Sequence, residues 1–77
     1  MTTYLEQVLA VLGSAPHPLS IFEIMEERGH ATREQQRKVR RWFRAALRQA
    51  LRRELVTRSL ERNPRKGYAM YMYSLLA

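Results

Sequence analysis

The stretch Thr32–Leu60, TREQQRKVRRWFRAALRQALRRELVTRSL, decides the fold because the period of its apolar residues changes within it. Seven apolar residues between 39 and 51 are separated alternately by three positions and by one, which is a single stripe along a helix. They are Val39, Trp42, Phe43, Ala46, Leu47, Ala50 and Leu51. From Leu55 the composition becomes that of a strand. We therefore predict a long helix over about 33–53, followed by the first strand of a sheet over 55–60.

A second strand is predicted over 68–75, where Tyr and Met alternate with other residues. The seven residues between the strands, 61–67, contain Asn-Pro near the start and Gly at the end. Such residues favour a turn, because Pro fixes its own φ angle and Gly allows positive φ. The two strands should therefore form an antiparallel hairpin with a basic tip.

Two shorter helices are predicted before the long one, over 4–12 and 21–28, with Gly13 and Gly29 ending them. All three helices begin with a capping box, in which Ser or Thr is followed three residues later by Glu or Gln. The pairs are Thr3 with Glu6, Ser20 with Glu23, and Thr32 with Gln35. Three helices followed by a hairpin define an α+β fold, and 77 residues are enough for a single domain, 1–77.

The core is expected to form from one face of each helix. The apolar stripe of the long helix includes Trp42 and Phe43, which we assign to core packing; the alternative is that they stack on bases of a single strand. His17 and His30 are assigned to loops. The residues expected to face inward on the first two helices are Leu5, Val8, Leu9, Leu12, Ile21, Ile24 and Met25, with Glu23, Glu26 and Glu27 facing outward.

Charge is distributed unevenly along the chain, whose net charge is +7. Residues 1–31 carry a net charge of −3, whereas residues 32–66 hold thirteen Arg or Lys and three Glu. The long helix alone holds nine Arg or Lys and one Glu, many of them spaced i,i+4, where like charges repel. A face built only for solubility would mix both signs. The pattern therefore predicts a surface for a polyanion, and nucleic acid is the usual one.

Other classes of function find little support in the composition. The chain has no Cys, no Gly-rich phosphate loop and no catalytic motif, so we expect neither an enzyme nor a metal or cofactor site. The N-terminus lacks the basic segment of a signal peptide, and no apolar run approaches the roughly 20 residues that span a bilayer. We expect a cytoplasmic protein, associated with the nucleoid if it binds DNA, with no membrane partner.

The order of elements resembles the winged helix-turn-helix superfamily over nearly the whole chain. The hairpin is similar to the wing of the MarR and PadR groups of bacterial regulators, through Leu55-Val56-Thr57-Arg58, then Asn63-Pro64-Arg65-Lys66-Gly67-Tyr68, and finally Tyr73-Ser74-Leu75. The chain departs from these groups at Glu54, where they usually have Gly, and in a long helix that is about two turns longer. The flanking dimerisation helices of both groups have no counterpart in this sequence.

The resemblance implies a transcriptional regulator that binds duplex DNA, with the N-terminal half of the long helix in the major groove and the basic wing on the backbone or the minor groove. Arginine can grip guanine, and Gln can pair with adenine. The residues matched to these roles on the side of the helix opposite the apolar stripe are Arg33, Gln36, Arg37, Arg40, Arg41 and Arg44, and those on the wing are Arg62, Arg65 and Lys66. Thr32 and Gln35, at the start of the helix, could bond a phosphate.

Two other functions stay open. The same cationic face could bind RNA or single strands, or the chain could be an adaptor that binds proteins through its acidic second helix. The Tyr- and Met-rich final strand, 68–75, also leaves open a homodimer or a partner protein bound there.

Overall fold

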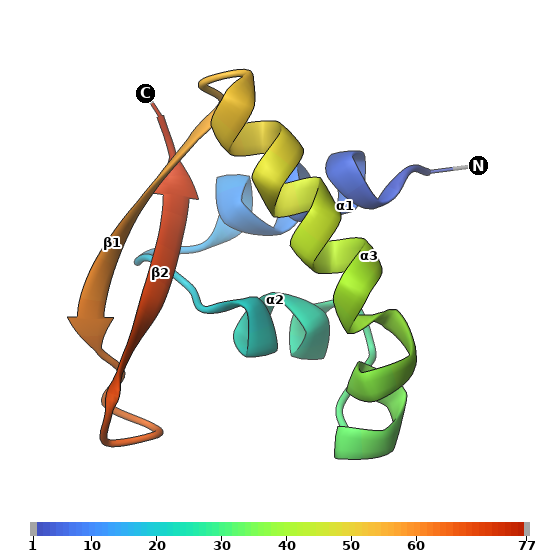
Figure 1. Cartoon of the computed structure of the whole chain (residues 1–77), viewed down its shortest axis with the longest axis vertical. Coiled ribbons are helices and arrows are strands. Elements are labelled where there is room, and N and C mark those ends of the chain that lie inside the picture. Colours follow the sequence, from blue (N-terminus) through green and yellow to red (C-terminus); the bar gives the residue numbers. More distant parts are fainter. Residues whose placement is uncertain (1, 77) are drawn as a thin grey trace.

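The computed structural model describes residues 2–76, in which three helices precede a two-stranded antiparallel hairpin (Figure 1). The helices are α1 (Tyr4–Ser14), α2 (Ile21–Glu27) and α3 (Arg33–Arg52), and the strands are β1 (Val56–Arg62) and β2 (Ala69–Leu75). The α+β layout predicted from the sequence is confirmed. No helix within residues 2–76 has both the length and the apolar character needed to cross a membrane.

All three predicted capping boxes are present. The hydroxyl groups of Thr3, Ser20 and Thr32 each accept a hydrogen bond from the backbone N–H three residues later. The Glu or Gln at that later position accepts in return from the backbone N–H of the cap. The starts of the helices were predictable because every one of these bonds joins residues close in sequence.

Helices α2 and α3 each end one residue earlier than predicted, and α1 ends two residues later. Helix α1 continues through Gly13 and ends at Ser14, so the prediction that Gly13 ends it is wrong. Gly13 lies instead where α1 approaches β2, since a Cβ atom built there would be 3.4 Å from Leu75 Cδ1. A methyl group at Gly13 would make only an ordinary contact with Leu75, so packing against β2 does not require glycine at this position.

Helices α2 and α3 end in the same hydrogen-bonded motif. After α2, the N–H of Gly29 bonds to Glu26 O and that of His30 to Met25 O. After α3, the N–H of Glu54 bonds to Leu51 O and that of Leu55 to Ala50 O. This is the Schellman pattern, whose first residue beyond the cap has positive φ. Gly29 has φ 91°, and Glu54 adopts φ 57° at the equivalent position.

The hairpin pairs Val56 with Leu75 at its base and Arg62 with Ala69 near its tip. Strand β1 thus begins one residue later and ends two residues later than predicted. A further antiparallel bridge joins Tyr73 to Leu19 in the α1–α2 loop. The Leu19 N–H donates to Tyr73 O at 2.9 Å, and the Tyr73 N–H donates to Leu19 O at 2.7 Å. Strand β2 therefore lies between β1 and Leu19, and the base of the hairpin is tied to the helical layer.

The core lies where the three helices meet the base of the hairpin. Phe43, Ile24, Met25 and Val8 are fully buried at its centre. The other buried members are Leu12, Leu19, Ala46, Leu47, Ala50, Val56 and Tyr73.

The assignment of Trp42 to the core is wrong, because its side chain is 45% exposed. Adjacent residues on a helix project about 100° apart, so only one of Trp42 and Phe43 can point at α1 and α2. Phe43 takes that place, while Trp42 lies at the border of the packed face. There its ring stacks on Tyr4, with centroids 6.2 Å apart and planes 13° from parallel.

Candidate nucleic-acid interface

Every Arg and Lys of α3 is exposed. Within residues 2–76 the only ion pair joins Arg65 to Glu26, so no carboxylate neutralises the cations of α3. The surface that results is a dense positive field on one helix. We call it the α3 cationic face, and it consists of Arg33, Arg37, Lys38, Arg40, Arg41, Arg44, Arg48 and Arg52.

Half of this face forms a row along the helix. Arg33, Arg37, Arg40 and Arg44 are separated by four, three and four residues, which is one side of an α-helix. The Trp42 border of α3 faces Tyr4 at the start of α1. The arginine row occupies the border of the packed face opposite to Trp42, because its members project roughly 140–180° away from Trp42 around the helix axis.

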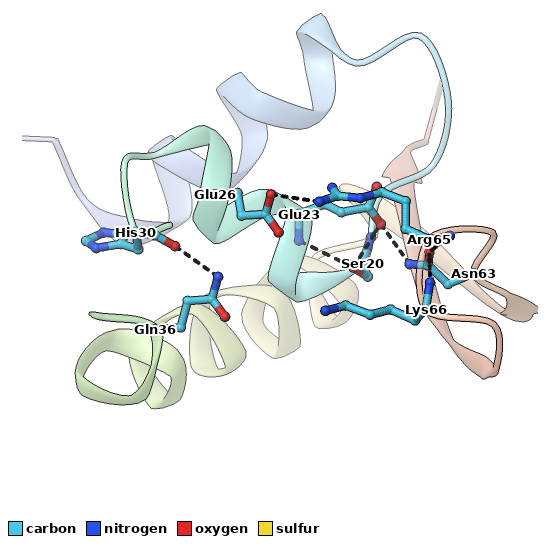
Figure 2. Close-up of polar contacts among 8 residues, drawn as sticks. All are labelled: Ser20, Glu23, Glu26, His30, Gln36, Asn63, Arg65 and Lys66. Carbon is cyan, nitrogen blue, oxygen red and sulfur yellow. Dashed lines mark hydrogen bonds and ion pairs between the residues drawn. The ribbon is translucent and has the colours of Figure 1, made fainter. Parts of the chain in front are cut away.

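Gln36 does not belong to the exposed face, so the prediction that it lies opposite the apolar stripe is wrong. Its side chain is half-buried, and Nε2 donates to the backbone carbonyl of His30 at 3.0 Å (Figure 2). The reason is visible in the spacing, because Gln36 precedes Val39 by three residues and Phe43 by seven and therefore shares their side. Gln36 fastens the α2–α3 turn instead of pointing outward.

Thr32 is exposed and lies at the start of α3, as predicted, but its hydroxyl is engaged in the cap. Thr32 Oγ1 accepts from Gln35 N at 3.1 Å. Gln35 Oε1 in turn accepts from the N–H groups of Ala31 and Thr32, at 3.0 and 3.1 Å. These bonds occupy several donors that would otherwise face an anion at this helix start.

The hairpin loop is organised by the side chain of Asn63, which the sequence analysis named only as part of a turn. Its side chain is buried, and Oδ1 accepts from the N–H groups of Arg65 and Lys66 at 2.9 and 3.3 Å. Its Nδ2 donates to Glu23 Oε1 of α2 at 2.9 Å (Figure 2). The Asn-Pro turn signal predicted a loop here, but the link to Glu23 joins residues forty positions apart and is invisible in the sequence.

Glu23 is the acceptor on which this link depends. Burial alone would raise its pKa, but that effect is outweighed by hydrogen bonds from the backbone and hydroxyl of Ser20 and from Asn63, together with the charge of Arg65. The pKa of Glu23 is therefore lowered below the ordinary value of 4.5. A stably ionised Glu23 holds the hairpin loop against the start of α2. This corrects the expectation that Glu23 simply faces outward.

The three predicted contacts of the hairpin are exposed but have different surroundings. Arg65 donates to Glu26 at 3.2 Å while its side chain stays 60% exposed. Lys66 Nζ lies 5.7 Å from the centre of the Phe22 ring. In Figure 2 the two side chains leave the loop on either side of α2, with Arg65 reaching Glu26 and Lys66 extending on the side of α3.

Arg62 and Arg65 also line a groove of about 840 Å³ between the hairpin loop, α2 and the α1–α2 loop. Glu26 and Glu27 line the same groove, so its charges are mixed. The structure thus brings the predicted α3 arginines onto one continuous face, whereas Arg62 and Arg65 border a separate hollow.

Arg58 was missed by sequence reasoning, although a signal was available. Its guanidinium carbon lies 4.2 Å from the centre of the Tyr71 ring on the neighbouring strand. Arg58, Leu60 and Arg62 share one face of β1 because side chains alternate along a strand. Because Arg58 and Arg62 are four positions apart on a strand, the same alternation in the sequence would have placed Arg58 beside Arg62 among the predicted contacts of the hairpin.

The chain matches no family model, and comparison with curated proteins and with solved structures finds no relative either. The case for a function therefore depends on the geometry and charge of its own residues.

Proposed function

We propose that this chain is a winged helix-turn-helix protein that binds duplex DNA and regulates transcription. The observation that carries the proposal is the α3 cationic face, with eight exposed Arg or Lys on one helix. None of them forms an ion pair with any residue between 2 and 76. Like charges spaced i,i+4 on a helix repel, and this repulsion is relieved when a polyanion binds.

Two features of the fold support the winged-helix assignment. The bridge between Leu19 and Tyr73 gives the order helix, short strand, helix, helix, hairpin. Glu54 has φ 57°, the backbone conformation that glycine adopts most easily. Glu54 departs in residue type from the Gly usual at this position in the MarR and PadR groups, but its own backbone has a conformation that suits glycine.

In the proposed complex, the N-terminal half of α3 enters the major groove. Arg33, Arg37, Arg40 and Arg44 form the row that would face base edges, where an arginine fork can bond O6 and N7 of guanine. Helix α3 is about 30 Å long and the groove is about 12 Å wide, so one half of the helix reads bases while the other reaches phosphates.

The hairpin would meet the adjacent backbone or minor groove with Arg62 and Lys66. Arg65 would contribute less, because it already forms an ion pair with Glu26 at 3.2 Å. Thr32 would contribute as a hydroxyl donor, since its oxygen already accepts from Gln35 N in the helix cap.

The test is a selection of binding sites from random duplexes, followed by salt titration of the selected site. The logarithm of affinity should fall with the logarithm of salt concentration, with a slope of about −0.9 for each phosphate neutralised. Two double variants separate the roles of the two halves of α3. Arg37→Ala with Arg40→Ala changes the N-terminal half, and Arg48→Ala with Arg52→Ala changes the C-terminal half. They are matched because each removes two charges.

The first pair should reduce both affinity and the preference for the selected site, by about tenfold or more for each lost base contact. The second pair should reduce affinity for all duplexes alike. Equal affinity for selected and random duplexes would overturn regulation by sequence. If the variant with Arg37→Ala and Arg40→Ala binds DNA as tightly as the original protein, α3 is not part of the interface.

A second candidate, binding to single strands, is favoured by one observation. Trp42 is 45% exposed, stacks on Tyr4, and has the Arg41 guanidinium 4.5 Å from its ring centre. Exposed aromatic rings beside cations are the usual platforms for unpaired bases. Trp42→Leu should weaken single-strand binding several-fold and leave duplex binding unchanged if this candidate is right, and duplex competition should displace the single strand poorly.

A further inference from the structure

The apolar surface of the protein is concentrated on the hairpin. Among residues 2–76, seven large apolar side chains are exposed, and six of them lie between Leu55 and Leu76. Leu60 is the most exposed of these, at 64%, and it lies in the middle of β1 opposite Tyr71. This concentration marks a surface that a partner would cover.

Strand β1 forms an open edge of the sheet. It pairs only with β2 within the described residues, whereas the far side of β2 is bridged by Leu19. Figure 1 shows β1 as the outermost element on its side of the molecule. An exposed strand of seven residues presents a row of unpaired backbone groups.

The phase of the ladder identifies which backbone groups are free. Hydrogen bonds from Asn63 N to Tyr68 O and from Leu76 N to Leu55 O bracket the paired strands. Hydrogen-bonded and non-bonded pairs alternate in an antiparallel ladder, so the odd-numbered residues of β1 bond to β2. The even-numbered residues therefore turn their N–H and C=O groups away from β2. Val56 is buried at the base of the hairpin, and the exposed members are Arg58, Leu60 and Arg62.

The same three residues also share one face of the strand, because side chains alternate. A strand added to this edge would thus meet an arginine, a leucine and a second arginine at every other position. Complementary side chains on the added strand are a carboxylate, an apolar group and a second carboxylate at the same spacing.

A second copy of this chain fits the edge poorly. Two β1 strands paired antiparallel about Leu60 would place Arg58 of each copy opposite Arg62 of the other, and like charges directly opposite are destabilising. The arginines therefore discourage self-pairing while they favour an acidic partner.

We propose that the open edge of β1 binds an extended segment of a partner protein, in which two acidic residues flank an apolar residue at alternate positions. The segment adds to the sheet as a further strand. Its backbone bonds to the free groups of Arg58, Leu60 and Arg62, and its carboxylates face the two guanidinium groups. This inference does not depend on DNA binding.

The test uses the whole chain and a capped heptapeptide, Thr-Glu-Thr-Val-Thr-Glu-Thr. The control peptide has Lys in place of both Glu and keeps the apolar centre and the strand propensity. Amide hydrogen exchange measured by NMR should show new protection at Arg58, Leu60 and Arg62, with little change at Thr57, Ser59 and Glu61, whose N–H groups already bond to β2. The acidic peptide should bind at least about tenfold more tightly than the control.

A charge swap, Arg58→Glu with Arg62→Glu, should reverse the preference between the two peptides, and the unchanged protection of the odd-numbered amides would show that the hairpin is still folded. The proposal is overturned if both peptides bind alike or if protection does not alternate. It is overturned also if the free protein is already protected there and has the mass of a dimer, or if a DNA duplex protects these amides and the acidic peptide does not.

Discussion

Glu54 and Gly29 occupy the same position in two copies of one helix-ending motif, and only one of them suits it. Both residues have positive φ, 57° for Glu54 and 91° for Gly29. Glycine has no Cβ atom to clash there, whereas an L-residue with a side chain pays about 1–2 kcal/mol. Glu54 is therefore a site of local strain that the rest of the fold tolerates.

We expect Glu54→Gly to stabilise the protein. Relief of the left-handed conformation exceeds the extra chain entropy that glycine gains in the unfolded state, so the free energy of unfolding should rise by about 0.5–1 kcal/mol. Urea denaturation measures it. Gly29→Ala is the matched control and should lower the free energy of unfolding by about 1 kcal/mol. A Cβ atom at Gly29 meets no neighbour within 4 Å, so only the backbone conformation is unfavourable. A stabilising Gly29→Ala would contradict this account.

The lowered pKa of Glu23 makes stability depend on pH. A carboxyl whose pKa is lower in the folded than in the unfolded chain contributes stability that is fully present above the unfolded value, about 4.5. That contribution is lost as pH falls through the folded pKa. The midpoint of urea unfolding should therefore decrease as the solution is acidified below that value.

Glu23→Gln should flatten this acid dependence, because its side chain no longer titrates. Glu27 is exposed on the same helix and makes none of the contacts of Glu23, so Glu27→Gln is the control and should retain the slope of the original protein. An identical slope for both variants would show that Glu23 does not link the hairpin loop to α2.

At the scale of the element, α3 balances a well-packed side against a repulsive one. Phe43, Ala46, Leu47 and Ala50 hold it to the core. Five like-charged pairs spaced i,i+4 lie on its other side, each unfavourable by a few tenths of a kcal/mol. They are Arg33/Arg37, Arg37/Arg41, Arg40/Arg44, Arg44/Arg48 and Arg48/Arg52. The repulsion on this side lowers the stability of the free protein, and under the proposed function a bound polyanion would relieve it.

The double substitution Arg37→Gln with Arg44→Gln should therefore stabilise the fold while weakening DNA binding. It removes four of these pairs and keeps helix propensity, so the gain at low salt should be about 1 kcal/mol. Thermal unfolding at low and high salt measures it, and the gain should shrink as salt screens the charges. Gln49→Arg adds a like charge four residues before Arg53 and should therefore lower the stability at low salt. A double variant less stable at low salt would contradict the prediction.

At the scale of the whole molecule, stability rests on a core small enough for one side chain to dominate it. Phe43 is fully buried and contacts rings from two other parts of the chain, with centroids 5.2 Å from Tyr4 and 5.7 Å from His30. A chain of this length has a total stability of only about 5–10 kcal/mol.

Phe43→Ala should lower the free energy of unfolding by about 3–5 kcal/mol, which is much of the total. Trp42→Ala, at the adjacent position, should cost about 1–2 kcal/mol because nearly half of its side chain is already exposed. Circular dichroism melts compare the two, and Phe43→Leu gives an intermediate value if Phe43→Ala does not fold. Equal costs at the two positions would contradict the assignment of Phe43 alone to the core.

The amino-acid sequence by itself determined the features that depend on neighbours along the chain. The three caps, the order of elements, the turn around Asn63-Pro64 and the density of cations on α3 could all be predicted, because they arise from residues within a few positions of one another. The arginines of the candidate interface were found in this way.

Only the tertiary structure decided what each side chain meets across the fold. The burial of Gln36, the exposure of Trp42, the link between Asn63 and Glu23, and the bridge at Leu19 all depend on elements distant in sequence. Local patterns state which side of a helix or strand is apolar, but not where that side ends or which strand edge stays open. The physical reason is that packing joins surfaces through space, where separation along the chain gives no measure of distance.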